Sequence, residues 1–366
     1  MSTNPSDHFA ATYSEARARF LAAARARGLV LRHYAHPVAK GAQGEELALD
    51  VGVLGDPHAK EVLLLTAGTH GAEGFCGSGC EIGLLADDAF VARVARDGVR
   101  VVFLHALNPY GFSHLRRTNE DNVDLNRNFR DWSSAPAPNL AYAEVHGFIV
   151  PDTWPPSAAN DAELRAYLAA HGEKALQQAV TAGQSEHPDG LFYAGVRPAW
   201  SNGILRRVLR EEAAGARTLA WIDYHTALGP RGHGEMIYNG ADNPDDIART
   251  KAFWGPAVTS FYDGSSTSAA LTGVNGSAVR DECPGVAYAG IALEYGTLPV
   301  LTVMQALRAD QWLANHPDAA PAQRAAIKQA VRDAFYQDAD DWKAMLHAQS
   351  LARANEALAG LVASRG

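Results

Sequence analysis

A histidine and a glutamate three positions apart are the residues of this sequence best suited to chemistry. His70 and Glu73 lie in residues 66–74, a glycine-rich segment that reads TAGTHGAEG. An apolar run at residues 62–65 precedes it and an apolar-periodic stretch follows it, so we predict a turn between a buried strand and a helix. Imidazole nitrogen and carboxylate oxygen are ligands that Zn²⁺ accepts at about 2.0–2.2 Å. The pair could therefore supply two ligands of a catalytic zinc site.

His225 can supply the third ligand, which distinguishes the pair from a chance occurrence. It directly follows the strand-like run at residues 218–224. Three protein ligands of the His₂Glu type leave a fourth position for water, and zinc lowers the pKa of that water toward about 7. Asp223 and Thr226 flank His225 and could orient its ring, because a metal-bound histidine usually donates its other nitrogen to an oxygen. The sequence thus predicts one Zn²⁺ per chain, although ligand type alone leaves other divalent ions open.

Glu294 follows a further strand-like run, residues 290–293, and is the candidate general base. Glutamate is rarely buried without a partner, so a glutamate at the end of a buried strand suggests a function. Near zinc-bound water it would accept a proton and pass it to the leaving amine. A salt bridge to an internal arginine is the alternative role for this side chain.

A polar segment, residues 116–129, carries the candidate substrate-binding groups. Its many hydrogen-bonding side chains predict a long loop, which is either functional or simply a solvated surface loop. Arg117 could stabilise the oxyanion that develops on the attacked carbonyl. Asn126 and Arg127 could bind a substrate carboxylate, since a guanidinium binds carboxylates through two parallel hydrogen bonds.

Composition places these residues in an ordinary globular chain. The sequence has 366 residues and a mass of 39.1 kDa, with 47% hydrophobic and 20% charged residues, which suffices for one large α/β domain. A formal net charge of −9 argues against nucleic acid and anionic membrane surfaces as partners. The three cysteines give no disulfide framework. Residues 1–7 lack a basic stretch before an apolar one and no run of about 18 apolar residues occurs, so we expect a soluble, cytoplasmic protein.

The elements that position these residues alternate between strand-like and helix-like segments. Strands are predicted at residues 29–36, 46–54, 62–65, 101–104, 218–224, 235–238 and 290–293. Helices are predicted at residues 14–27, 75–96, 161–178, 204–213, 245–261, 301–313 and 320–361, with an irregular excursion at residues 133–160. The alternation predicts an α/β fold with a mainly parallel or mixed sheet, built as one domain over residues 1–366.

The chemically promising residues also form an ordered set of motifs. These are HGAE at residues 70–73, Arg117-x-Asn119, VDLNRNF at residues 123–129, DYHT at residues 223–226 and LEYGT at residues 293–297. The set resembles the zinc carboxypeptidase family related to carboxypeptidase A. More narrowly, it resembles an uncharacterised bacterial branch near the aspartoacylase and succinylglutamate desuccinylase-like members. The resemblance covers residues 62–297 or so.

That resemblance implies a phosphorylase/hydrolase-like α/β fold, with a twisted, mixed and mostly parallel sheet of about eight strands between helices. It also implies one Zn²⁺ and the hydrolysis of an amide bond. Carried over motif by motif, it gives roles to the following residues: His70, Glu73 and His225 as metal ligands, Glu294 as general base, Arg117 or its neighbour Arg116 at the oxyanion, and Asn126 with Arg127 at the substrate carboxylate.

Two features depart from the family pattern. The tyrosine of the family's mobile loop has no clear counterpart, because Tyr262 and Tyr288 fit its spacing from the base poorly. Residues 133–215 form a long insertion-like region with aromatic residues beside glycine-rich turns. This region could cap the cleft and restrict the substrate to something small.

Together these observations predict a zinc-dependent hydrolase that cleaves an amide bond of a small substrate with a free carboxylate, as a metallocarboxypeptidase does. A deacylase of N-acyl amino acids is the alternative enzyme, so the expected partner is a small peptide or an acyl amino acid. A metal-binding protein without turnover is a further alternative, although it would need neither Glu294 nor Arg117. A serine hydrolase is disfavoured because the sequence has no Gly-x-Ser-x-Gly nucleophile elbow.

Overall fold

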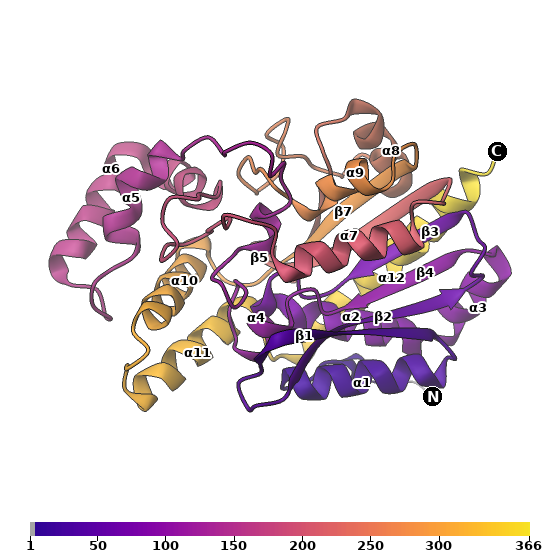
Figure 1. The fold of residues 1–366 in the computed structure, drawn as a ribbon, viewed down its shortest axis with the longest axis horizontal. Coiled ribbons are helices and arrows are strands. Elements are labelled where there is room, and N and C mark those ends of the chain that lie inside the picture. Colours follow the sequence, from indigo (N-terminus) through magenta and orange to yellow (C-terminus); the bar gives the residue numbers. More distant parts are fainter. Residues whose placement is uncertain (1–3) are drawn as a thin grey trace.

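A seven-stranded mixed β-sheet forms the centre of the computed structural model, which describes residues 4–366 (Figure 1). Its strands are β1 (Val30–Lys40), β2 (Glu46–Gly55), β3 (Glu61–Thr66), β4 (Arg100–His105), β5 (Thr218–Arg231), β6 (Gly234–Tyr238) and β7 (Ala287–Gly296). They are ordered β1-β2-β4-β3-β5-β7-β6 across the sheet. β4, β3, β5 and β7 are parallel, whereas β1, β2 and β6 pair antiparallel at the two sides. The predicted α/β fold with a mixed sheet flanked by helices is confirmed.

Every predicted strand occurs, and the differences concern the number and direction of strands that the resemblance implied. Within residues 4–366 the sheet has seven strands, compared with about eight expected. Antiparallel strands border a parallel centre, so the sheet is mixed rather than mostly parallel. Residues 1–3 of the predicted domain lie outside the described residues.

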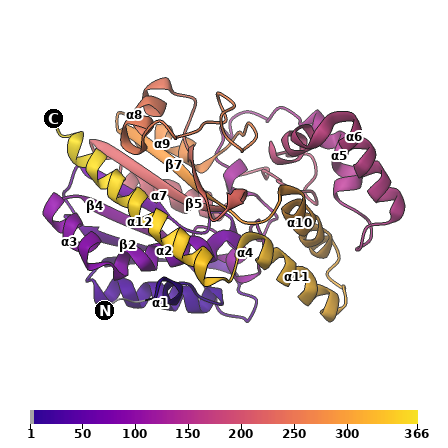
Figure 2. The ribbon, with the colours of Figure 1, turned by 180° about the vertical axis from the view of Figure 1, so that it is seen from behind.

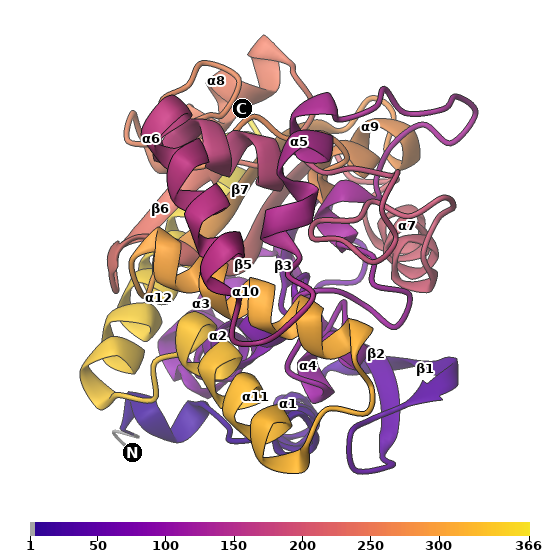
Figure 3. The ribbon, with the colours of Figure 1, turned by 90° about the vertical axis from the view of Figure 1, so that its left-hand side faces the viewer.

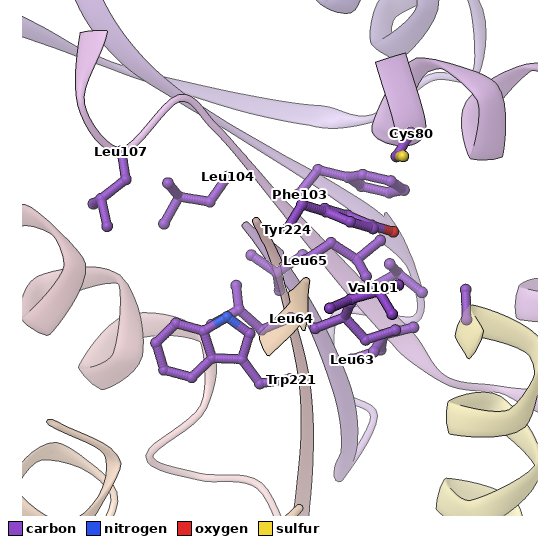
Figure 4. Close-up of a cluster of buried hydrophobic side chains, with 14 of the residues drawn as sticks. Leu63, Leu64, Leu65, Cys80, Val101, Phe103, Leu104, Leu107, Trp221 and Tyr224 are labelled. Carbon is purple, nitrogen blue, oxygen red and sulfur yellow. The ribbon is translucent and has the colours of Figure 1, made fainter. Parts of the chain in front are cut away.

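The central strands are buried on both faces, which explains their apolar sequences. All six residues of β3 are buried, and so are the first ten residues of β5. Parallel strands that are covered by helices on both sides form continuous apolar runs in the sequence. Figure 4 shows side chains of β3, β4 and β5 packed together, with Cys80 on the same side as Phe103 and Tyr224. This core holds the ends of the central strands in place.

Helices cover both faces of the sheet. α1 (Tyr13–Ala26), α2 (Gly74–Ala86), α3 (Asp88–Asp97) and α12 (Asp340–Ala363) lie on the face seen in Figure 2, and α7 (Trp200–Glu212) crosses the opposite face in Figure 1. The other α-helices are α4 (Pro109–Ser113), α5 (Leu140–Ile149), α6 (Ala158–Thr181), α8 (Pro244–Trp254), α9 (Ala278–Glu282), α10 (Val300–Asn315) and α11 (Pro321–Phe335). Short 3₁₀ helices are η1 (Pro5–His8), η2 (Gly71–Glu73), η3 (Leu125–Arg127) and η4 (Asn275–Ser277). No helix within residues 4–366 is long and apolar enough to cross a membrane.

Two segments predicted as single helices are each two helices. The segment at residues 75–96 breaks at Asp87, whose side chain accepts a hydrogen bond from the backbone N–H of Phe90 and caps α3. The segment at residues 320–361 is divided into α11 and α12. Apolar periodicity continues across such breaks, so it does not reveal them.

Helices α5, α6, α10 and α11 form a second hydrophobic cluster beside the sheet (Figure 3). The cluster joins much of the insertion-like region to the C-terminal part of the chain. Residues 133–160 were predicted to be irregular, but they contain α5, which begins where Asn139 accepts a hydrogen bond from the N–H of Tyr142. The insertion-like region is therefore a packed part of the fold.

Arg308 of α10 links α10 to α5 and α6 within this second cluster. It is fully buried and donates to the carbonyl oxygens of Phe148 at 2.7 Å and Ile149 at 3.1 Å, and to Asn160. We predict that Arg308→Met lowers the free energy of unfolding by about 2–4 kcal/mol, because buried carbonyl groups lose their donors. Arg165→Met, at an exposed position of α6, is the control and should change it by less than about 0.5 kcal/mol. Urea unfolding measures both, and equal small losses would contradict the prediction.

Candidate metal centre and active-site cavity

The candidate site lies at the carboxyl ends of three neighbouring parallel strands. His70 and Glu73 follow the end of β3, His225 lies in β5, and Glu294 lies in β7. In the strand register, Thr66 pairs with Asp223 and His225 pairs with Glu294. Strand pairing therefore brings together groups that are far apart in the sequence, at the edge of the sheet where open α/β folds bind ligands.

His70, Glu73 and His225 converge on one point. The Nδ1 atoms of the two histidines lie 3.2 Å apart, and carboxylate oxygens of Glu73 lie 3.0 Å from Nδ1 of His70 and 3.1 Å from Nδ1 of His225. Ligand atoms at about 2.0–2.1 Å from a tetrahedral zinc ion lie about 3.3 Å from one another. All three side chains are buried. The group therefore has the donors and the spacing of a zinc site.

Each histidine holds its other ring nitrogen against a buried carboxylate. Nε2 of His225 lies 2.7 Å from Oδ2 of Asp223, and Nε2 of His70 lies 3.2 Å from Oδ1 of Asp124. At His225 the carboxylate favours a proton on Nε2 and leaves the lone pair of Nδ1 for a metal. Nε2 of His70 also lies 2.8 Å from Nη2 of Arg117, which can only donate. The suggested orienting role of Asp223 agrees with its contact with His225, whereas Thr226 donates its hydroxyl to the carbonyl of Phe335 instead.

Sequence reasoning missed two residues of this supporting shell. Asp124 was seen only as part of a motif, because nothing in its spacing relates it to His70. Asn275 donates its Nδ2 to Asp223 at 2.6 Å, and its backbone N–H donates to Oδ1 of Asn126 at 2.8 Å. It comes from the η4 turn, and no signal in the sequence pointed to it.

Arg117, and not Arg116, lies at the site. Arg117 donates to Oδ2 of Asp124 at 2.9 Å and to Oε1 of Glu73 at 3.1 Å, and its guanidinium lies 4.7 Å from the ring centre of Phe192. Arg116 forms an ion pair with Asp310 at 3.0 Å and does not line the cavity described below. The adjacent arginines thus have different partners.

Glu294 lines the same cavity as the metal-binding histidines and pairs with His225 in the strand register. Oε1 accepts a hydrogen bond of 3.0 Å from the N–H of Leu228. Burial, together with the negative charge of Glu73, raises the pKa of Glu294 to about 7. Within residues 4–366 it forms no salt bridge to an arginine, so the structural alternative for this residue finds no support. A carboxyl group with such a pKa can both accept and release a proton near neutral pH.

Arg127 is a buried guanidinium without a carboxylate within ion-pairing distance among residues 4–366. Nε and Nη2 donate to the carbonyl oxygen of Thr181, and Nη1 donates to that of Asn126 at 2.8 Å. Three of its five N–H groups are therefore used, and two remain. Burial lowers its pKa to about 10. A buried cation held only by neutral carbonyl groups favours an anion in the adjoining space.

These residues line one cavity. His70, Arg117, Arg127, His225 and Glu294 provide its polar surface together with Asn126 and a few other polar groups. Most of the remaining lining is apolar and comes from Leu228, Ile237, Phe261, Leu271, Val274, Ala292, Val300, Val303, Met304, Leu307 and Phe335. Such a cavity, apolar with a few convergent polar groups, is typical of a small-molecule site.

The insertion-like region contributes directly to this cavity. Gln177 and Thr181 of α6 line it, and so does Phe192. The hypothesis that residues 133–215 cap the cleft agrees with this placement. Tyr262 and Tyr288, the two poor candidates for a mobile-loop tyrosine, do not line the cavity, and their hydroxyl groups donate to the carbonyl oxygens of Gly240 and Asn239.

The charges around the site fit a divalent cation. Four carboxyl groups, those of Glu73, Asp124, Asp223 and Glu294, lie near two guanidinium groups. Burial raises the pKa of a carboxyl group, yet His70 and His225 hold that of Glu73 well below its usual value. Burial lowers the pKa of an imidazole, yet Asp223 and Glu73 raise that of His225, so a positive charge is favoured between these carboxylates. Donor set and spacing thus both fit Zn²⁺.

The sequence matches one protein family over most of its length. The family model is described as "Protein of unknown function (DUF2817)" and matches residues 9–349. No curated protein matches the sequence. Among solved structures, bovine thrombin-activatable fibrinolysis inhibitor in complex with tick carboxypeptidase inhibitor aligns with 11% identity and a TM-score of 0.45, over 88% of this chain and 97% of that chain. A metallo-carboxypeptidase from Burkholderia cenocepacia aligns with 12% identity and a TM-score of 0.37, over 92% of this chain and 69% of that chain. Similarity at this level assigns no function.

Loss of a ligand should abolish metal binding. We predict that the wild-type protein, purified without chelator, contains about one zinc per chain and that His70→Ala contains almost none, because two ligands do not hold zinc in competition with solvent. His58→Ala, which changes an exposed histidine, is the matched control and should keep its zinc. Elemental analysis per chain measures all three, and zinc retained by His70→Ala would contradict the assignment of this ligand.

Proposed function

We propose that this chain, which belongs to the DUF2817 family, is a zinc-dependent hydrolase that cleaves an amide bond of a small substrate with a free carboxylate, as metallocarboxypeptidases do. The observation that carries the proposal is the convergence of His70, Glu73 and His225 beside a cavity that the two histidines line together with Glu294 and Arg127. Three protein ligands with a cavity beside them are the pattern of a catalytic zinc site, since a structural site would have four.

The metal would be held by Nδ1 of each histidine and by the carboxylate of Glu73. Zinc, when bound there, supplies the Lewis acidity that activates water and polarises the amide carbonyl. Asp223 keeps the imidazole ring of His225 in the required orientation. Asp124 and Arg117 both contact Nε2 of His70. The chain's own residues therefore prepare the site before any substrate enters.

Glu294 is the proposed proton carrier. It would take a proton from the attacking water and deliver it to the nitrogen of the scissile amide, so that the amine leaves as a neutral group. The side chain of Glu294 lines the same cavity as His70 and His225. A protein that only binds metal would not need such a carboxyl group beside the ligands, which is the argument against a silent metal-binding protein.

Arg127 and Asn126 are proposed to bind the substrate carboxylate. The two unused N–H groups of Arg127 can donate to the carboxylate, and the negative charge of the carboxylate would compensate the buried guanidinium. Arg117, which contacts the ligand Glu73, is proposed to stabilise negative charge on the carbonyl oxygen during attack. A deacylase of N-acyl amino acids would use the same groups in the same way, because its substrate also has an amide bond and a free carboxylate.

Glu294→Gln tests the role of the general base. We predict that zinc content is unchanged while kcat falls by about 10²–10⁴-fold, because the amide side chain cannot accept the proton. Zinc-loaded protein would be tested on N-acyl amino acids and on short peptides. Unchanged kcat would contradict the assignment, and zinc content confirms that the variant is still intact.

Arg127→Met tests the carboxylate site. For a substrate and its carboxamide analogue, we predict that the preference of the wild type for the carboxylate falls by about 10–100-fold in the variant, because charge-assisted hydrogen bonds are lost. The ratio of the two kcat/KM values is the measurement, so a general loss of activity cancels. An unchanged ratio would show that Arg127 only anchors α6.

A further inference from the structure

The active-site cavity has two apolar walls that belong to different hydrophobic clusters. The first wall consists of Ile237, Phe261 and Val274 with Leu271 and Ala292. It lies beside the proposed carboxylate site: the backbone of Gly273 packs against the backbone of Arg127, and its carbonyl accepts from the N–H of Phe129. The side chain next to a substrate carboxylate would therefore meet this wall.

The second wall comes from the C-terminal helices and lies next to the metal ligands. It consists of Val303, Met304 and Leu307 of α10, Phe335 at the end of α11, and Leu228. Most of these residues share a cluster with Ala72 and Ala227, which are close in sequence to the ligands Glu73 and His225. Beyond the scissile carbonyl, the acyl half of a substrate would therefore meet the second wall.

The second wall provides nothing that could neutralise a positive charge. All of its side chains are apolar, and among residues 4–366 Glu294 is the only carboxyl group that lines the cavity. Glu294 already accepts a hydrogen bond from the N–H of Leu228. It is also the proposed proton carrier, so it is not free to pair with an ammonium group. The acyl half of a dipeptide carries an α-ammonium group, and burying such a charge without a partner is strongly unfavourable. The acyl half of an N-acyl amino acid is neutral.

We infer that the substrate is an N-acyl amino acid whose acyl group is uncharged and apolar, and that Met304 and Leu307 limit the length of that group. The inference rests on the proposed function. Water adds across the amide: the C–N bond breaks, the acyl carbon gains oxygen and leaves as a carboxylate, and the nitrogen gains hydrogen and leaves as the free amino group. Gln177, Thr181 and Phe192 of the insertion-like region also line this cavity.

One matched pair of substrates tests the charge argument. N-hexanoyl-L-leucine and L-norleucyl-L-leucine differ only in the α-ammonium group of the acyl half. For zinc-loaded wild-type protein we expect kcat/KM to be at least about 100-fold higher for N-hexanoyl-L-leucine, because the dipeptide buries an unpaired charge. Equal or faster hydrolysis of the dipeptide would overturn the inference and leave the proposed function standing.

A variant of the second wall tests the length argument. Met304→Trp should lower the ratio of kcat/KM for N-hexanoyl-L-leucine to that for N-acetyl-L-leucine by at least about tenfold, because each buried methylene is worth about fourfold. Activity on the acetyl substrate shows that the variant is folded. Equal losses on both substrates would overturn the assignment of Met304.

Binding separates failure of the inference from failure of the proposed function. If neither substrate of the pair is hydrolysed, the proposed function fails, and calorimetry with Glu294→Gln then decides the inference. Tighter binding of N-hexanoyl-L-leucine than of L-norleucyl-L-leucine would support an apolar, uncharged acyl site. Equal affinities would overturn it.

Discussion

The buried carboxylate of Asp223 is the group on which the candidate site depends. It accepts hydrogen bonds from Thr66, Thr69 and Asn275 and holds Nε2 of His225. These partners come from β3, the turn after it, the η4 turn and β5. A charge buried this deeply is tolerated only when its hydrogen bonds are satisfied. Asp223 therefore links strand pairing in the sheet to the position and tautomer of a metal ligand.

Arg127 has a comparable role at the other end of the cavity. Its contacts with Thr181 join the last turn of α6 to the loop that carries Asn126. The helices that cover the cavity are themselves packed on α10, whose residues form the second apolar wall. α6, the proposed carboxylate site and the proposed acyl wall are consequently parts of one packed unit. In the proposed enzyme, the contacts that stabilise the C-terminal half of the chain would also set the size and polarity of the substrate.

Sequence patterns reveal the sheet and the reactive residues but only part of their support. Buried strands produce continuous apolar runs, so the sequence predicts strands at residues 62–65 and 218–224. The reactive residues that come after these runs are therefore predicted to lie at strand ends. Asp124 and Asn275 were missed because their contacts with His70 and Asp223 depend on how two loops fold over the strand ends. The break at Asp87 was missed because a capping side chain interrupts a helix without interrupting its apolar pattern. Reactive residue types can be recognised in the sequence alone, whereas contacts between loops cannot.

X-ray absorption at the zinc edge of the zinc-loaded protein is the most direct test of the central claim, because it identifies the atoms bound to the metal. We predict about four nitrogen and oxygen ligands at about 2.0–2.2 Å, with the outer-shell scattering of two imidazole rings. Glu73 and water would account for the remaining ligands. Sulfur at about 2.3 Å, or a first shell without imidazole, would show that zinc binds elsewhere and would contradict the claim that His70 and His225 assemble a catalytic metal site.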